Sequence, residues 1–387
     1  METARVSERG ARRWALLGHP WIYRSDIEEA PAGAAGVVRV ADRAGTVVGM
    51  ALWSPPSAIG LRMLTRGERG IDGSFWRERV RAAVAYRAVL APDATAYRLV
   101  HAEADGLPSL VVDRYGDALV IQLLSAGLEA RRDEVVGALG EVVAPAGILA
   151  RNDVPVRRHE GLPRTTELLA GAVPREIEVR EGRVRYLAAP WTGQKTGAFL
   201  DQRENRTRAG ALARGRALDC FAYHGSFALH LAAAAAEVTA VDSSGEALER
   251  AQANAALNGF AHLRTVQANV FDFLRAEEAA GSRYDTIVLD PPAFAKTRAT
   301  VSQALRGYKE INLRALRILA AGGTLCTFCC SFHVDREHFR AMLVAAATDS
   351  GRHVRWLEAR GQALDHPEIL QIPETGYLKG AILQAVD

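Results

Sequence analysis

The sequence feature that most constrains the fold is residues 217–242, ALDCFAYHGSFALHLAAAAAEVTAVD. It comprises a short apolar strand, a tight turn, an Ala-rich helix and a second strand that ends at Asp242. This order predicts half of a mononucleotide-binding α/β unit, whose ligand lies where the first strand passes into the helix. Such folds place a ribose-binding carboxylate about 20 positions further on. Asp242 occupies that position.

The turn narrows the choice of ligand. It contains a single glycine, Gly225, and therefore lacks the G-x-G-x-x-G pattern that binds a pyrophosphate. A ligand with a ribose but no pyrophosphate suits the site better. S-adenosylmethionine is the candidate that we favour.

Length and composition predict a folded protein of several domains. A chain of 387 residues, 49% of them apolar, is too long for one ordinary core and predicts two or three domains. No apolar run reaches the roughly 20 residues of a membrane span, and the N-terminus lacks a hydrophobic signal core. We therefore expect a cytoplasmic chain with no membrane partner. A net charge of +3 is compatible with nucleic acid without requiring it.

The cationic residues are almost all arginine. Lysine occurs only at Lys195, Lys296, Lys309 and Lys379. Lys195 lies in the polar loop GQKTG, and Lys296 follows the segment DPPAF, so both are candidates for contacts with a ligand. Codon bias is an equally good explanation for Lys309.

The four cysteines do not form a metal site by their spacing. Cys326 and Cys329 make a C-x-x-C pair, but GTLCTFCC reads as a strand, in which side chains alternate between faces. Cys326 and Cys330 then share one face, Cys329 points to the other, and no second pair completes a tetrahedral site. Each of these thiols, and Cys220, is therefore either core packing or a nucleophile.

The N-terminal part divides into two small domains. Alternating strands from Ala11 to Leu64 predict a β-barrel, in which Arg12 and Arg13 with nearby aromatic residues could form an RNA-stacking surface. Spacing slightly favours the other interpretation, with Trp14 and Trp21 as barrel core. A helix over 74–90, with Ser74 as N-cap, and several strands predict a small α+β domain. The expected boundaries are 1–68, 69–175 and 176–387.

The C-terminal part predicts a Rossmann-like, doubly wound α/β domain. Strands alternate with helices, which is typical of a parallel sheet, and the tail adds an antiparallel edge. Sites in such sheets lie at the carboxyl ends of the strands. Five strand ends should therefore converge there, at residues 219–223, Asp242, Asn269, 290–294 and Cys330.

Two of these ends carry chemistry. The prolines of Asp290-Pro291-Pro292-Ala293-Phe294 stiffen the turn, which can hold a carboxylate and an aromatic ring beside a flat substrate. An ordinary strand exit is the structural alternative. Cys330 lies at the mouth of the sheet, where a cationic cofactor and basic side chains could lower the pKa of its thiol.

Together these motifs resemble a known family. The segments TGAFLDQR, LDCFAYHGSFALH, VDSS, LDPPAF and TFCCSF are similar to those of the RlmI-type ribosomal RNA methyltransferases, which form 5-methylcytosine in large-subunit rRNA. GHPWIYRSDI resembles the start of their N-terminal PUA domain, and AEADGLPSLVVDRYGD resembles their central domain. DHPEI and PETGYLKG resemble their C-terminal strands. The resemblance covers nearly the whole chain.

The resemblance implies roles for individual residues. Cys330 would attack C6 of a cytosine as a thiolate, Asp290 would bind the N3/N4 edge, and Phe294 would stack on the unstacked base. The implied partner is large-subunit ribosomal RNA, and a homodimer is a candidate assembly. The expected substrate-binding residues are Phe294, Pro291, Lys296, Arg12 and Arg13. The expected cofactor-binding residues are Lys195, Thr196, Arg203, Asp219, Phe221, Tyr223, Gly225, Asp242, Asn269 and Asp290.

The chain departs from the family pattern in places. It has Asp219, His224 and Ser226 where relatives commonly show Asn, Thr and Gly, which implies local repacking around the cofactor. It has Pro292 where many 5-methylcytosine enzymes carry a second cysteine, so another base must remove the C5 proton. Two alternatives stay open. One is methylation of an exocyclic amine without a thiol, and the other is an RNA-binding protein without catalysis.

Overall fold

The computed structural model describes residues 1–90, 93–295 and 297–387. The chain forms two compact units. The first comprises residues 1–179, 188–200 and 364–376, and the second comprises residues 180–187, 201–363 and 377–387.

The first unit begins with a six-stranded sheet of order β2-β6-β5-β4-β1-β3. Neighbouring strands are antiparallel except for the parallel pair β1 and β4. This sheet has its own apolar core, which includes Val40, Trp53 and Met63. Its elements are β1 (Thr3–Val6), α1 (Glu8–Ala15), β2 (Trp21–Ile22), β3 (Ile27–Glu29), β4 (Gly36–Ala41), β5 (Val47–Trp53) and β6 (Leu61–Arg66).

The expectation of strands from Ala11 onward was wrong at its start, because α1 occupies that segment. The Ser7 side chain accepts from the N–H of Gly10 and caps the helix, and Glu8 lies in its first turn. Arg12 and Arg13 fall in the last turn, where cations stabilise a helix. The local capping residues therefore outweigh the strand pattern.

A five-stranded sheet of order β11-β10-β9-β8-β7 completes the first unit. The helix expected over 74–90 is confirmed as α2, but its cap is Asp72, which accepts from the N–H groups of Ser74 and Phe75. Two further helices are separated at Ala130 and Arg131. The elements are α2 (Gly73–Leu90), β7 (Ala96–His101), β8 (Leu110–Tyr115), β9 (Ala118–Leu123), α3 (Ala126–Glu129), α4 (Arg132–Val143), β10 (Gly147–Arg151) and β11 (Thr166–Gly171).

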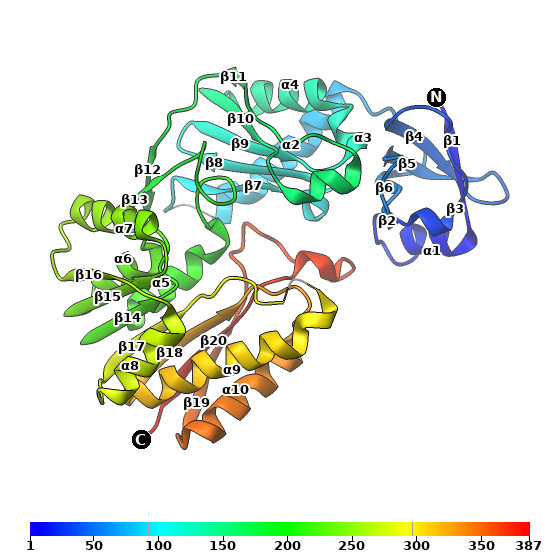
Figure 1. Ribbon diagram of the computed structural model, residues 1–387. Coiled ribbons are helices and arrows are strands. Elements are labelled where there is room, and N and C mark those ends of the chain that lie inside the picture. The colour runs from blue at the N-terminus through cyan, green and yellow to red at the C-terminus, as the bar shows by residue number, and fades with distance from the viewer. Residues whose placement is uncertain (91–92, 296) are drawn as a thin grey trace. The chain divides into compact units, whose positions relative to one another are not determined.

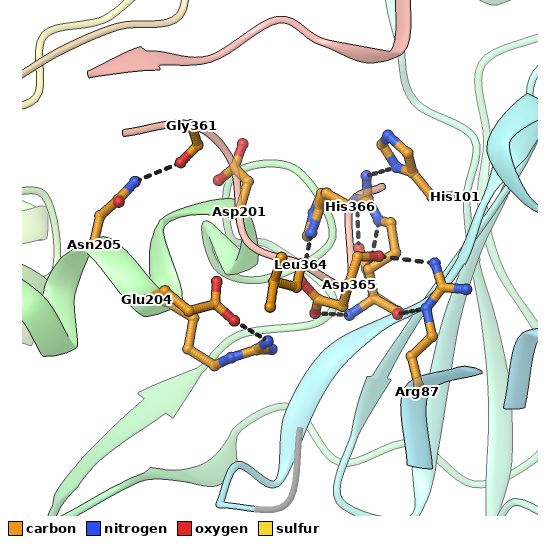
Figure 2. A network of polar contacts seen from close by, with 12 residues as sticks. Arg87, His101, Asp201, Glu204, Asn205, Gly361, Leu364, Asp365 and His366 are labelled. Atoms are coloured by element: carbon orange, nitrogen blue, oxygen red, sulfur yellow. Dashed lines mark hydrogen bonds and ion pairs between the residues drawn. The ribbon is translucent and has the colours of Figure 1, made fainter. Parts of the chain in front are cut away.

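A segment from near the C-terminus also belongs to this unit. The carboxylate of Asp365 accepts from the N–H of Arg98 at 2.8 Å, and its main-chain carbonyl accepts from Arg87, as Figure 2 shows for Arg87. The ring of His366 lies 5.2 Å from that of His101. The main chain of β7 and the guanidinium of Arg87 in α2 thus fix a residue that follows them by more than 250 positions in the chain.

The second unit is built on a seven-stranded sheet of order β16-β15-β14-β17-β18-β20-β19. β16 to β18 run parallel, and β20 and β19 are antiparallel to their neighbours. The doubly wound sheet and its antiparallel edge are therefore confirmed. The strands are β14 (Arg216–Cys220), β15 (Glu237–Asp242), β16 (Leu263–Gln267), β17 (Tyr284–Leu289), β18 (Leu319–Cys329), β19 (Val354–Arg360) and β20 (Lys379–Ala385).

Helices cover both faces of this sheet. Figure 1 shows α8, α9 and α10 together on one side of the sheet, and the apolar core there includes Leu289, Ile311 and Phe339. The helices are α5 (Arg203–Leu212), α6 (Ser226–Ala232), α7 (Gly245–Leu257), α8 (Val270–Ala279), α9 (Val301–Ile318) and α10 (Arg336–Ser350). No helix among the described residues is long and apolar enough to cross a membrane.

A buried ion pair ties the start of the second unit to its helices. The hairpin of β12 (Ile177–Glu181) and β13 (Val184–Ala188) carries Glu181, whose carboxylate accepts from Arg206 of α5 at 2.8 and 2.6 Å. Both side chains are only 2% exposed. His230 of α6 lies 3.0 Å from the same carboxylate.

Candidate active site

The turn after β14 has an unusual backbone. Phe221 and Tyr223 have φ values of 66° and 50°, a left-handed conformation that non-glycine residues rarely adopt. Gly225 follows with φ 82°, and a Cβ placed there would lie 3.0 Å from the Cβ of Ala251. Strain of this kind is concentrated where a chain must shape a ligand site. The turn between β14 and α6 is therefore the expected place for a cofactor.

Asp242 closes this turn from the end of β15. Its Oδ2 accepts from the N–H of Tyr223, and its Oδ1 accepts from the N–H of Ser244, both at 2.9 Å. Each carboxylate oxygen can accept more than one hydrogen bond. Asp242 can therefore hold the turn and bind the hydroxyls of a ribose at the same time.

Asp219 offers a buried acceptor beneath the turn. Its Oδ2 accepts from the N–H of Ala228 at 2.8 Å, while its Oδ1 has no hydrogen-bond partner among the described residues. Burial raises the pKa of this carboxyl well above its usual value, and Asp290 and Asp242 raise it further. Because buried polar atoms normally have a hydrogen-bond partner, Oδ1 of Asp219 could form a hydrogen bond with a bound ligand.

His224 fills the underside of the turn. It is only 1% exposed, and neither ring nitrogen has a hydrogen-bond partner within the described chain. Burial, assisted by Arg206 and Arg250, lowers the pKa of His224 to about 3. Its ring packs 4.7 Å from that of Tyr223 and 5.3 Å from that of Tyr186. The buried ring of His224 is therefore neutral and packs against the two tyrosine rings.

An apolar surface lies beside the ends of β14 and β16. Phe221, Val266, Ala268 and Phe271 are partly buried against the core, which suits the flat face of an adenine. Asn269 is exposed and caps α8, because its Oδ1 accepts from the N–H of Phe271 at 2.9 Å. Its predicted contact with adenine stays a prediction.

Asp290 is held by a neighbour that the sequence did not indicate. The Nε2 of Gln202 donates to Asp290 Oδ1 at 2.8 Å, and the Oε1 of Gln202 accepts from Asn205 at 2.6 Å. Gln202 and Asn205 lie at the start of α5, far from Asp290 in the sequence. This chain of hydrogen bonds fixes the orientation of the carboxyl that begins the Asp-Pro-Pro turn.

Phe294 lies in an aromatic cluster at the end of that turn. Its ring centroid is 4.6 Å from that of Tyr308, 5.9 Å from that of Phe271 and 6.3 Å from that of Phe221. The ring is partly exposed. The cluster places an aromatic surface between the Asp-Pro-Pro turn and the turn after β14.

Cys330 follows the last residue of β18 and reaches the Asp-Pro-Pro turn. Its Sγ lies 3.6 Å from the carbonyl oxygen of Pro291. Cys330 is partly exposed, whereas Cys220, Cys326 and Cys329 are fully buried. The described residues contain no group of His, Cys, Asp or Glu that could hold a metal. Two predicted strand ends therefore meet, and only one of the four thiols is open to a substrate.

The remaining residues that were predicted to bind cofactor or substrate lie in several parts of the chain. Arg203 is buried and donates to Glu204 at 2.7 Å. Lys195 and Thr196 belong to the first unit, where the hydroxyl of Thr196 donates to Asp113 at 2.6 Å. Arg12 is exposed on α1. Lys296 lies outside the described residues, and the ligand contacts of all these side chains stay predictions.

Known proteins resemble the chain over its full length. Residues 118–365 match the family of S-adenosylmethionine-dependent methyltransferases, and residues 6–66 match a PUA-like domain. "Ribosomal RNA large subunit methyltransferase I" of Tolumonas auensis is 40% identical over 100% of both chains. The protein of that name from Shewanella amazonensis is 40% identical over 94% of each.

Solved structures share the fold at lower identity. A SAM-dependent methyltransferase from Streptococcus mutans has a TM-score of 0.83 at 20% identity and covers 99% of this chain, with 100% of its own length matched. The methyltransferase SMU.776, solved with SAH, has a TM-score of 0.85 at 20% identity, with the same coverage.

The strained turn, its carboxylates and these matches define the class. The chain is an S-adenosylmethionine-dependent methyltransferase with an N-terminal PUA-like domain. More narrowly, it belongs to the family of the ribosomal RNA large subunit methyltransferases I. The fold class and the cofactor predicted from the sequence are confirmed. S-adenosylmethionine would supply a methyl group on a sulfonium. That Asp242 and Asp219 bind this cofactor stays a prediction.

Replacing Asp242 by asparagine should weaken cofactor binding. The change removes a charged acceptor, and a hydrogen bond to a charged group is worth about 1.5–3 kcal/mol, or roughly 10- to 100-fold in affinity. Titration calorimetry with S-adenosylhomocysteine measures the effect. Asp272→Asn, an exposed change on α8, is the matched control. Equal affinities of the two variants would exclude Asp242 as a cofactor ligand.

Proposed function

We propose that this protein methylates C5 of a cytosine in large-subunit ribosomal RNA through a covalent adduct with Cys330. The substrate class comes from the relatives named above. The reaction type is supported by one observation: the partly exposed thiol of Cys330 contacts the Asp-Pro-Pro turn at Pro291. The proposed nucleophile and a carboxyl oriented by Gln202 thus follow the carboxyl ends of two neighbouring parallel strands, β18 and β17. The cytoplasm, where ribosomes are made, is the proposed location.

The chemistry assigns a step to each residue. The thiolate of Cys330 adds to C6, and the electrons of the C5–C6 double bond move to make C5 nucleophilic. C5 then takes the methyl group from the sulfonium, which leaves as a neutral thioether. Asp290, oriented by Gln202, hydrogen-bonds the N3/N4 edge and stabilises the adduct. A base finally removes the C5 proton, the double bond re-forms and the Cys330 thiolate is expelled.

The target base must leave its stack to reach this site. The ring of Phe294 offers a surface for the flipped base, since single-stranded bases stack on aromatic side chains. Arg12 on α1 and the half-buried Arg13 are proposed to contact the phosphate backbone. A homodimer stays a prediction, which light scattering in solution can test.

Mass spectrometry of methylated ribosomal RNA tests the proposal. Large-subunit RNA from cells that lack this chain is incubated with the purified protein and S-adenosylmethionine. We expect one new 5-methylcytosine with the intact protein and none with Asp290→Ala. A methylated exocyclic amine would favour the reaction without a thiol. No incorporation by the intact protein would favour an RNA-binding role.

A further inference from the structure

Lys379 is a buried lysine in a chain that uses arginine at almost every cationic position. It is the first residue of β20, lies opposite Cys329 in the antiparallel pairing with β18, and is 5% exposed. A buried cation normally pairs with a carboxylate. Within the described chain, no carboxylate lies within ion-pair distance of Lys379. The position therefore needs an explanation other than a salt bridge.

The ammonium group of Lys379 instead binds two main-chain carbonyls. It donates to the oxygen of Ser331 and to that of Tyr377, each at 2.7 Å. Ser331 directly follows Cys330, so one of these bonds reaches the turn that carries the nucleophile. An ammonium has three N–H donors, and the described contacts use two of them. A guanidinium has a different, planar arrangement of donors and would not reproduce this pair of bonds.

The same turn is fastened from two other sides. The hydroxyl of Ser331 accepts from the N–H of Ala295 at 3.0 Å and lies 2.9 Å from the hydroxyl of Tyr308. These neutral contacts fix the backbone next to Cys330 but bring no charge. Lys379 adds a positive charge to these neutral contacts. A cation near a thiol favours its thiolate form.

The charged groups around Lys379 agree with this arrangement. Burial lowers the pKa of Lys379, whereas Cys329, Cys330 and Asp335 act to raise it and Arg336 acts to lower it. The interaction between the ammonium and a thiolate is mutual, so the group that a Cys330 thiolate stabilises also stabilises that thiolate. Cys329 is fully buried in the core, which leaves Cys330 as the thiol that a reagent can reach.

We propose that Lys379 is a positioning residue for methyl transfer: it holds the Cys330–Ser331 turn through two carbonyls and supplies the charge that favours the Cys330 thiolate. The inference rests on the role of Cys330 proposed above. Its consequence is nevertheless a property of the resting protein. The pH at which Cys330 ionises should depend on the side chain at position 379.

Alkylation of the full-length protein tests this inference without methyl transfer. Cys330 is reacted with iodoacetamide at a series of pH values, and modification of its peptide is measured by mass spectrometry. In Lys379→Met, we expect the midpoint of the pH profile to rise by about one unit, since loss of a nearby opposite charge shifts a pKa by about that much. Lys379→Arg keeps the charge, so the midpoint of its pH profile should lie close to that of the original protein.

Controls separate charge from folding. Lys309→Met removes a partly exposed lysine that pairs with Asp349 and should leave the profile unchanged. If Lys379→Met does not fold, Lys379→Gln is used as the neutral variant, because its side-chain amide can still donate to the carbonyls. An unchanged midpoint in the folded neutral variant, or an equal rise in Lys379→Arg, would overturn the inference. The proposed function is tested by a different measurement, the methylation activity of Cys330→Ala. Retained methylation in that variant would contradict the proposed function, whereas the alkylation profile tests only the role of Lys379.

Discussion

Replacing Cys330 by alanine is expected to lower methyl transfer by at least about a thousandfold, because a covalent pathway cannot proceed without its nucleophile. The side chain is partly exposed, and its contact with the carbonyl of Pro291 is weak. Its removal should therefore leave the fold and the affinity for S-adenosylhomocysteine nearly unchanged. Single-turnover transfer of a labelled methyl group to ribosomal RNA measures the rate.

Cys329→Ala is the matched control. Cys329 is the neighbouring residue, but it is fully buried in the core formed by β18, α9 and α10. Its truncation should lower stability by about 1 kcal/mol while leaving turnover within severalfold of the original. The opposite result, with turnover lost in Cys329→Ala and kept in Cys330→Ala, would show that Cys329 is the nucleophile and that our proposal names the wrong cysteine.

A substituted substrate tests the adduct directly. RNA that carries 5-fluorocytosine at the target has no C5 proton to remove, so the enzyme should remain attached to the methylated base. The original protein should give a complex that survives denaturation, and Cys330→Ala should give none. Turnover by Cys330→Ala without such a complex would instead support methylation of an exocyclic amine.

The parts of the site that the sequence predicts well are those fixed by strand topology. Parallel strands must present their carboxyl ends at one edge, so the meeting of Cys330 with Pro291 follows from the order of strands and helices. The bond between Asp242 and Tyr223 follows in the same way. Here a periodic pattern and short motifs carry enough information.

Sequence patterns do not predict the hydrogen-bond partners of these residues. Gln202 orients Asp290 and Lys379 binds the turn at Ser331, yet neither lies near its partner in the sequence. The attachment of Asp365 to Arg98 and Arg87 in the first unit has the same character. A hydrogen bond between residues that are distant in the sequence leaves no periodic signal, because hydrophobic patterns report only local structure. The strand pattern also missed the helix α1, which its capping residue Ser7 stabilises locally.

Replacing Arg206 by methionine is expected to destabilise the second unit by about 3–5 kcal/mol, because it leaves the buried carboxylate of Glu181 without its main partner. Burial by itself would raise the pKa of Glu181, but Arg206 and His230 outweigh it and hold the pKa below its usual value. A carboxyl with a lowered pKa contributes stability above its unfolded pKa of about 4.3, and that contribution is lost as the pH falls further. The variant should therefore lose this part of its acid sensitivity.

Arg208→Met is the control for the Arg206 substitution, since it lies on the same helix and pairs with Glu358 at the surface. Exposed pairs contribute about 1 kcal/mol or less, so its unfolding should change little. Urea unfolding is monitored by hydrogen exchange in peptides from β14 and α6, so that the measurement reports on the second unit alone. Combining Arg206→Met with Glu181→Met removes both charges and should recover part of the loss, because hydrophobic replacements of buried pairs are often tolerated. Equal destabilisation by Arg206→Met and Arg208→Met would mean that the buried pair is not what holds the β12–β13 hairpin to α5.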